Sequence, residues 1–213
     1  MTASLSVSGV VRVPGDKSIS HRALLFAALS HGSSRVRSIL PSADVHSTAG
    51  VLRALGVTVP ELSADFVMHG RGPLSLRVPR QDLDCGNSGT TTRLVAGIVA
   101  GRENITARFV GDASLSKRPM QRIARPLIAM GARVESERGD GLPMQVSGAA
   151  LHSIDWRSEH ASAQIKSAIM LAAVSSGVAV TVSEPTRSRD HTERMLAARG
   201  VTLQLGETTV TVP

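Results

Sequence analysis

The sequence predicts an α+β fold of three βαβαββ modules, with helices packed at the centre and sheets outside them. A pair of helix-like segments recurs three times along the 213 residues, at a spacing of about seventy residues. That spacing is too long for a solenoid repeat and suits a βαβαββ module. Short β-branched or alternating runs lie between the helices, and the first helix of each pair is apolar on most sides. A helix that is hydrophobic all round is buried, so the first helices belong at the centre.

The first helix of each pair starts from small polar residues and stops at a glycine. We expect these helices within residues 16–32, 86–101 and 161–177. Residues 94–100 and 169–174 inside them are apolar or small throughout, which is typical of helices buried on most sides. Small polar starts and closing glycines are the usual signals of helix ends.

The second helix of each pair is amphipathic and ends in a related phrase. We expect these helices within residues 44–59, 118–134 and 189–203. The phrases are Leu52-Arg-Ala-Leu-Gly-Val, Leu127-Ile-Ala-Met-Gly-Ala and Leu196-Ala-Ala-Arg-Gly-Val. Their glycines lie where a helix C-terminus needs a residue that tolerates the left-handed conformation. These glycines are Gly56, Gly131 and Gly200.

Seven runs of strand length separate the helices. Most are bounded by Gly, Pro, Asp or Ser, which favours strands that end in turns. The expected strands are residues 7–13, 33–39, 66–69, 105–110, 144–147, 178–183 and 208–212.

Composition indicates a globular protein with a substantial core. The chain is 42% hydrophobic, enough for one large domain or for a domain with fragments of another. Cys85 is the only cysteine, which excludes an internal disulfide and favours a reducing, cytoplasmic setting. We expect Cys85 to be a small buried hydrophobe, because the sequence around it shows no pair of a histidine and an acidic residue that could activate it as a nucleophile. The chain starts without a signal-peptide pattern, and no apolar run approaches the ~20 residues of a membrane span, so no membrane partner is expected.

The net positive charge of the chain predicts an anionic partner. The formal net charge is +7 and the isoelectric point is near 11.1. Nucleic acid is disfavoured, because the chain has no Tyr, one Trp and three Phe and so offers little surface for base stacking. The cations are spread singly over turns and helix starts instead of forming a basic tail or helix face. This distribution favours a small, multiply charged ligand.

The segment Val13-Pro-Gly-Asp-Lys-Ser-Ile-Ser-His-Arg predicts a turn that leads into a helix. Lys17, Ser18 and Arg22 would then lie on the first turns, beside backbone N–H groups that lack helical partners. Two cations and a hydroxyl at a helix N-terminus favour an anion site. In a plainer interpretation Ser18 or Ser20 is a helix cap, and the cations are solvated. The recurrence of comparable segments favours the site, with a phosphorylated ligand.

Five ordered segments extend this pattern through the chain. They are Pro14-Gly-Asp-Lys-Ser-Ile-Ser-His-Arg, Gly86-Asn-Ser-Gly-Thr, Gly111-Asp-Ala-Ser-Leu-Ser-Lys-Arg-Pro-Met, Ser162-Ala-Gln-Ile-Lys-Ser and Arg189-Asp-His-Thr-Glu. Together they resemble the EPSP synthase family, the 3-phosphoshikimate 1-carboxyvinyltransferases, over about Leu5 to Val201. The details are similar to the class II branch, because Ser-Ala-Gln stands where the other branch usually has Ser-Ser-Gln.

The resemblance implies a fold of the α/β prism type and the first domain of a two-domain enolpyruvyl transferase. It implies that residues 1–13 form an N-terminal strand that belongs to, or leads from, the second domain. Residues 14–213 would form the first domain, with modules of about 14–80, 81–150 and 151–213. The second domain, with the catalytic aspartate and additional arginines and lysine of the family, has no counterpart here. We therefore expect this half to bind substrate and to need the C-terminal half for turnover.

The family reaction indicates what the site must do. The 5-hydroxyl of shikimate 3-phosphate adds to phosphoenolpyruvate, and the tetrahedral intermediate expels inorganic phosphate. The resemblance thus implies these two substrates, glyphosate as an inhibitor that competes with phosphoenolpyruvate, and neither a cofactor nor a metal. Both substrates are anions, so the site needs several positive groups as well as proton transfer.

The family's binding residues carry over to matching positions of this sequence. The resemblance assigns shikimate 3-phosphate to Lys17, Ser18, Arg22, Ser162, Ala163, Gln164 and Arg189. It assigns phosphoenolpyruvate to Lys17, Asn87, Gly89, Thr90, Arg118 and Gln164. Lys17 would be the catalytic residue, placed between the substrates to orient both and to take part in proton transfer. Gly89 would allow close backbone approach, and Arg118 would clamp a phosphate or carboxylate with its planar fork.

Several of these residues also have a plainer local interpretation. Residues 87–90 alone fit an ordinary Asx or glycine turn before a helix. Ser162 fits an N-cap, and Arg189 fits an ion pair with Glu193 on its own helix. Lys166 fits a solvated charge as well as a ligand. Asp44 matches a family aspartate, and we interpret it first as a cap.

Two other functions compete with this assignment. The nearer one is the sister enolpyruvyl transferase that acts on UDP-N-acetylglucosamine. It usually shows Lys-Asn after the first turn and a reactive cysteine in the third loop, where this chain has Lys17-Ser18 and Gly111-Asp-Ala-Ser. The other is a non-enzymatic RNA-binding module on a related βαβαββ fold, which the missing aromatics and Gly-Arg tracts disfavour.

Overall fold

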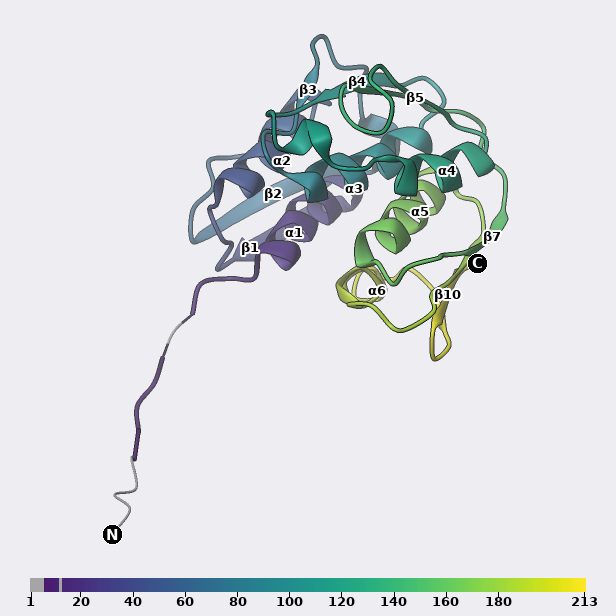
Figure 1. Ribbon diagram of the computed structural model, residues 1–213. Coiled ribbons are helices and arrows are strands. Elements are labelled where there is room, and N and C mark those ends of the chain that lie inside the picture. Colours follow the sequence, from purple (N-terminus) through teal and green to yellow (C-terminus); the bar gives the residue numbers. More distant parts are fainter. Residues whose placement is uncertain (1–5, 12) are drawn as a thin grey trace.

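The computed structural model describes residues 6–11 and 13–213 of the chain. Six α-helices are assigned within these residues, which confirms the predicted α+β class. They are α1 (Lys17–Leu29), α2 (Ala43–Ala54), α3 (Gly89–Ala100), α4 (Gln121–Ala129), α5 (Ala163–Ser176) and α6 (His191–Ala197). Figure 1 shows α1, α3 and α5 in the middle of the body with the strands around them, as the apolar character of the first helices predicts.

The strands form three separate sheets. They are β1 (His31–Arg37), β2 (Asp65–Arg71), β3 (Leu83–Asp84), β4 (Thr106–Val110), β5 (Arg133–Ser136), β6 (Met144–Ser147), β7 (Ile154–Arg157), β8 (Val180–Ser183), β9 (Gln204–Leu205) and β10 (Thr209–Val212). Two sheets have four strands each, in the orders β3-β4-β6-β5 and β7-β8-β10-β9. In each, the first two strands are parallel and the later pairs are antiparallel. Residues 83–147 and 154–212 therefore form two βαβαββ units of the same topology.

The first unit is reduced compared with the other two. Within the described residues its sheet holds β1 and β2 alone, paired antiparallel. Where the other units place a strand after their second helix, the carbonyls of Val59 and Pro60 instead accept hydrogen bonds from Arg53, at 3.0 and 2.8 Å. Pro60 also lacks the N–H that a strand ladder needs. The expected module of residues 14–80 thus has two strands rather than four.

Residues 6–11, ahead of α1, are exposed. Residues 6–11 carry no strand assignment, and Figure 1 shows them leading away from the body. Residues 1–5 and 12 of the expected N-terminal strand lie outside the described residues. The boundaries at residues 13 and 14, and the role of residues 1–13 in a second domain, stay predictions.

The central helices pack closely because small residues line their contact. α3 packs against α5, and a Cβ atom on Gly97 would lie 2.2 Å from the carbonyl oxygen of Ala168. Backbones can approach this closely only where a side chain is missing. The glycines after the second helices, Gly56, Gly131 and Gly200, have φ angles of 87°, 110° and 83°, which confirms their predicted left-handed conformation.

Cys85 lies in this core as a free thiol with none of its side chain exposed. Burial raises its pKa to about 12, so the thiol stays protonated and unreactive at neutral pH. The expectation of a small buried hydrophobe is confirmed. None of the helices within residues 6–11 and 13–213 combines the length and apolarity that a membrane crossing requires.

Candidate functional site

A cavity of about 430 Å³ lies where the N-terminal ends of α1, α3 and α5 meet. Five cationic and two acidic side chains line it, which gives a net charge of +3. Its lining residues are Asp16, Lys17, Ser18, Arg22, Asp44, Gly89, Thr90, Arg93, Arg118, Ala163, Gln164 and Arg189. Within the part of the chain that the structure describes, no three His, Cys, Asp or Glu side chains group as metal ligands.

Each of the three central helices starts with a side-chain cap beside this cavity. Asp16 accepts from the backbone N–H of Ile19 at 2.8 Å, and Ser88 accepts from that of Thr91 at 3.1 Å. Ser162 caps α5 in the same way. A capped N-terminus still presents first-turn N–H groups and the positive end of the helix dipole, so three such ends favour an anionic ligand. Asp16, not Ser18 or Ser20, is the cap of α1, which corrects the plainer interpretation.

Lys17 forms an exposed ion pair at the mouth of the cavity. Its Nζ lies 2.9 Å from Asp44 Oδ2, and the two side chains are 55% and 24% exposed. An exposed pair of this kind contributes about 0–1 kcal/mol, so a multiply charged ligand can draw the ammonium away. Interpreting Asp44 as a cap was wrong, because Ser42 holds the N-cap position of α2 and Asp44 lies in the first turn.

Arg22 is held rigidly at the floor of the cavity and is not a solvated charge. Only 2% of it is exposed. Its Nε donates to Thr192 at 2.7 Å, Nη1 donates to the hydroxyl and carbonyl of Ser18 at 2.7 and 3.1 Å, and Nη2 donates to Ser167 at 2.8 Å. Burial lowers its pKa to about 10, so the guanidinium stays charged at neutral pH. One of its five N–H groups is left for a ligand.

Arg93 joins the site although the sequence analysis did not select it. Its Nη1 donates to Gln164 Oε1 at 2.9 Å and its Nη2 to the Pro119 carbonyl at 3.1 Å. Gln164 in turn donates to the Thr90 hydroxyl at 3.0 Å, so α3 and α5 are joined at the cavity wall. Arg93 follows Gly89 by one helical turn and is the one charged residue of α3. That spacing was the signal that could have identified it.

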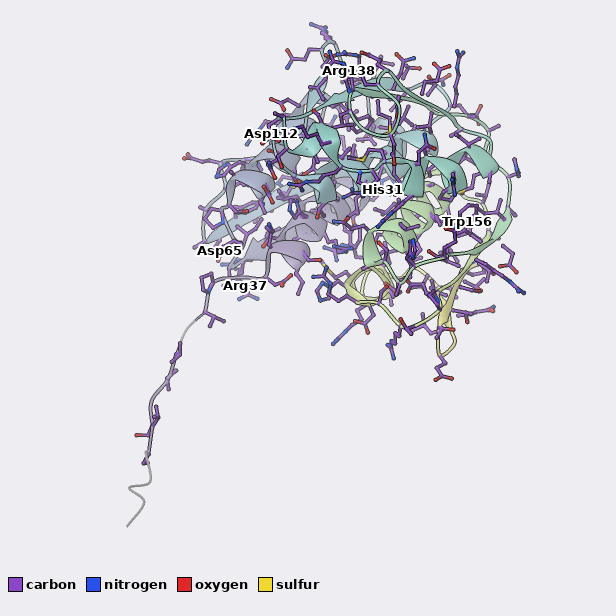
Figure 2. The ribbon with its side chains drawn as sticks, in the orientation of Figure 1. His31, Arg37, Asp65, Asp112, Arg138 and Trp156 are labelled. Atoms are coloured by element: carbon purple, nitrogen blue, oxygen red, sulfur yellow. The ribbon has the colours of Figure 1, made fainter. Side chains whose placement is uncertain are left out.

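Arg118 is oriented by a short chain of polar contacts. Its Nη2 donates to Asn87 Oδ1, and Asn87 Nδ2 donates to Asp112 Oδ2 at 2.6 Å. Figure 2 labels Asp112, which follows β4. Hydrogen bonds from Asn87 and from the backbone of Leu115 lower the pKa of Asp112, so its carboxylate is charged and fixes the amide. Asn87 therefore orients Arg118 and is not among the lining residues of the cavity, and its expected contact with a ligand stays a prediction.

The remaining predicted residues fall on the opposite wall. Ala163 and Arg189 line the cavity, whereas Ser162 caps α5 just behind it. Within the described residues Arg189 has no ion-pair partner, so its interpretation as a partner of Glu193 was wrong. Nine of the eleven predicted site residues thus line one cavity, and the other two support it.

A buried polar chain connects the starts of α1, α2 and α3. His21 Nδ1 lies 2.7 Å from the Thr48 hydroxyl, which lies 2.7 Å from the Thr91 hydroxyl, which donates to Ser88 at 2.7 Å. Burial lowers the pKa of His21 to about 4, because desolvation and nearby cations outweigh the attraction of Asp44. The imidazole is therefore neutral and buried below the cavity.

The protein should lose stability in acid through His21. Its pKa is 6.5 unfolded and about 4 folded. Below pH 6.5 the unfolded chain binds the extra proton first, so the free energy of unfolding falls until about pH 4, by roughly 3 kcal/mol. Urea unfolding between pH 7 and 4 measures this, and His21→Gln should flatten that part of the profile. An equally steep profile in the variant would assign the loss to other groups.

The family model and curated relatives that match this chain name the same family. The family model for EPSP synthase (3-phosphoshikimate 1-carboxyvinyltransferase) matches residues 1–213. A 3-phosphoshikimate 1-carboxyvinyltransferase of Bacillus subtilis is 48% identical over 208 residues, which cover 97% of this chain and 48% of the relative. The enzyme of that name from Chloroflexus aurantiacus is 45% identical over 214 residues, covering 100% of this chain and 49% of the relative. The chain spans about half the length of the curated relatives it matches.

Solved structures agree with the family comparison. EPSP synthase from Acinetobacter baumannii superposes with a TM-score of 0.91 at 38% identity, over 96% of this chain and 46% of that one. The enolpyruvyl transferase NikO from Streptomyces tendae gives a TM-score of 0.68 at 14% identity, covering 96% of this chain and 48% of that one. The second likeness concerns the fold alone.

Proposed function

The chain belongs to the EPSP synthase family, and from this premise we propose that its cavity is one wall of an enolpyruvyl transfer site. The reaction moves the enolpyruvyl group of phosphoenolpyruvate to the 5-hydroxyl of shikimate 3-phosphate and releases inorganic phosphate. The supporting observation is the convergence of three helix N-termini and five cationic side chains on one cavity of net positive charge. Two anionic substrates need such a surface in order to lie side by side.

Shikimate 3-phosphate would bind toward α5 and α6. Ala163 at the start of α5 and Arg189 before α6 face the cavity there, with Ser162 just behind. Backbone N–H groups at the start of α5 and the guanidinium of Arg189 would hold the 3-phosphate. The free N–H of Arg22 and the Ser18 hydroxyl would then hold the shikimate moiety, since both lie at the base of the same wall.

Phosphoenolpyruvate would bind toward α3. Gly89 and Thr90 open that helix, and Arg93 and Arg118 lie beside them with their charges close together. Burial lowers the pKa of Arg93, and the neighbouring Arg118 lowers it further, so an anion between the two guanidiniums would relieve their repulsion. Gln164 bridges the two substrate regions through its contacts with Arg93 and Thr90.

Lys17 would serve both substrates from the mouth of the cavity. The reaction joins the shikimate 5-oxygen to C2 of phosphoenolpyruvate while the 5-hydroxyl gives its proton to a base and C3 gains a proton from an acid. The resulting tetrahedral intermediate then loses phosphate and a C3 proton. An ammonium between the substrates lowers the repulsion of their charges and lies within reach of a proton transfer. Because this chain forms one wall, we propose that the C-terminal half of the same enzyme supplies the other wall and the remaining acid–base groups.

The direct test is calorimetric titration of the chain with shikimate 3-phosphate. We expect weak binding that Arg189→Ala abolishes, because a lost charged hydrogen bond costs about 1.5–3 kcal/mol, or roughly 10–150-fold in affinity. Arg22→Ala should also abolish it, but that side chain is buried and the substitution disturbs the fold as well. Arg187→Ala is the matched control, since Arg187 is 65% exposed, pairs with Asp190 and lies outside this cavity. Equal binding by the wild type and Arg189→Ala would contradict the assignment.

A further inference from the structure

Three charged side chains form a buried cluster behind the anion cavity. Lys166 Nζ on α5 lies 2.9 Å from Glu184 Oε2, just after β8, and 2.7 Å from Glu193 Oε1 on α6. None of the three side chains is more than 6% exposed. Interpreting Lys166 as a solvated charge was therefore wrong, and Lys166 is not among the lining residues of the anion cavity. The cluster borders a separate cavity of about 160 Å³ on the far side of these elements.

Glu184 ties together the two loops that carry the expected phosphate contacts. Its Oε1 accepts from the backbone N–H of Ser162 at 2.7 Å, directly before α5. Its Oε2 accepts from the Ser188 hydroxyl at 2.7 Å, directly before Arg189. Burial opposes ionisation of Glu184, but hydrogen bonds from Lys166, Ser188 and Ser162 outweigh it and lower the pKa below its ordinary value. The carboxylate thus remains an acceptor for both loops.

Glu193 holds α6 in place through its ion pair with Lys166. The neighbouring Thr192 accepts from Arg22 and lies 2.6 Å from the Ser167 hydroxyl, so its position fixes the guanidinium at the floor of the anion cavity. The ion pair between Lys166 and Glu193 holds this turn of α6 against α5. Lys166 therefore links, through one ammonium, the loop of Ser162, the loop of Arg189 and the support of Arg22.

We infer, on the basis of the function proposed above, that Lys166, Glu184 and Glu193 are positioning residues for the shikimate 3-phosphate pocket. They set the separation between the start of α5 and Arg189, and they do not touch the substrate. A role in stability alone accounts poorly for the cluster, because well-packed apolar residues often replace a buried ion pair without loss of stability. Apolar residues cannot replace the carboxylate that accepts hydrogen bonds from the Ser162 N–H and the Ser188 hydroxyl and so fixes the positions of both.

Two variants separate positioning from stability. Glu184→Gln keeps the shape and removes the charge, while the triple variant Lys166→Met/Glu184→Leu/Glu193→Leu replaces the whole cluster with apolar side chains. We expect the triple variant to melt close to the wild-type midpoint, because removing three buried charges offsets the loss of the acceptor for the Ser162 N–H and the Ser188 hydroxyl. We expect both variants to bind shikimate 3-phosphate at least tenfold more weakly, and their Ser162 amide to exchange hydrogen at least tenfold faster. Arg187→Ala, an exposed change in the same loop, should leave affinity and exchange within twofold.

The outcomes distinguish this cluster from the proposed function. A stable triple variant with wild-type affinity and wild-type exchange at Ser162 would overturn the positioning role. If Glu184→Gln fails to fold, the triple variant carries the test. If the wild type binds no shikimate 3-phosphate, the proposed function fails, whereas the amide exchange still decides whether Glu184 orders the loop. Faster exchange with unchanged affinity in both variants would likewise overturn a role in the pocket.

Discussion

Mixed with a separately expressed C-terminal half of the same enzyme, the chain is expected to release inorganic phosphate steadily from shikimate 3-phosphate and phosphoenolpyruvate. Alone it is expected to release none above the blank. The chain covers about half the length of its relatives, and its charged groups line a cavity that opens to solvent, which we propose is one wall of the complete site. Electrostatic stabilisation of a transition state needs preorganised groups in a site that excludes water, and one open wall does not provide it.

Reconstitution is expected because the chain has a hydrophobic core of its own around α1, α3 and α5. A half with its own core can fold separately, and substrates that bind across both halves stabilise their association by mass action. The measurement is phosphate release at fixed chain concentration while the second half is titrated in. Sustained turnover by the purified chain without any partner would show that its site is complete.

Gly89→Ala is expected to make such an assembly resistant to glyphosate. A Cβ atom at this position would lie 2.5 Å from Arg93 Nη1 and 3.5 Å from Arg118 Nη1. The added methyl group would therefore push on the two guanidiniums that we propose hold phosphoenolpyruvate, and it would narrow the pocket. Overpacking of this kind costs about 1–3 kcal/mol, so we expect a rise of roughly 5- to 150-fold in the glyphosate inhibition constant.

The same substitution should raise the KM for phosphoenolpyruvate much less, since the smaller ligand needs less of the space that the methyl group takes. Inhibition constants and KM values are measured on the reconstituted assembly, with Gly50→Ala on α2 as the control. A Cβ atom at Gly50 meets nothing within 4 Å, so that variant should match the wild type. If the wild-type assembly is already insensitive to glyphosate and Gly89→Ala does not change its inhibition constant, residues other than Gly89 control the access of glyphosate to the pocket.

The apolar helices and most of the glycine stops could be predicted because their signals are local. Gly32 is the exception, since α1 ends at Leu29 with Ser30 as its C-cap and Gly32 lies within β1. Four strands could not be predicted. β3 and β9 have two residues each, too few for any periodic pattern. β5 and β7 alternate between half-buried and exposed positions, so they lack the apolar run that marks a strand on the core. Their pairing with β6 and β8 stabilises them instead, and this contact is set by the tertiary fold.

Much of the site could also be predicted, because the motifs lie at helix starts that converge in this fold. What failed was the interpretation of single charges. Lys166 looks solvated in the sequence, since nothing local shows that Glu184 and Glu193 fold onto it. Arg93 was missed because its partners Gln164 and Pro119 come from other segments of the chain. Burial of Lys166 by remote partners leaves no local signal, and the one-turn spacing of Arg93 from Gly89 marks its helix face without showing its partners.

The most direct test of the catalytic assignment is phosphate release by the reconstituted assembly that carries Lys17→Met. Lys17 lies at the mouth of the cavity, largely exposed, so the variant should fold and associate with the second half as the wild type does. Lys117→Met, on a lysine outside the cavity, is the matched control and should turn over at the wild-type rate. We expect the Lys17→Met assembly to form and to release no phosphate above the blank. Wild-type turnover by that assembly would contradict the claim that this cavity is the chain's share of the active site.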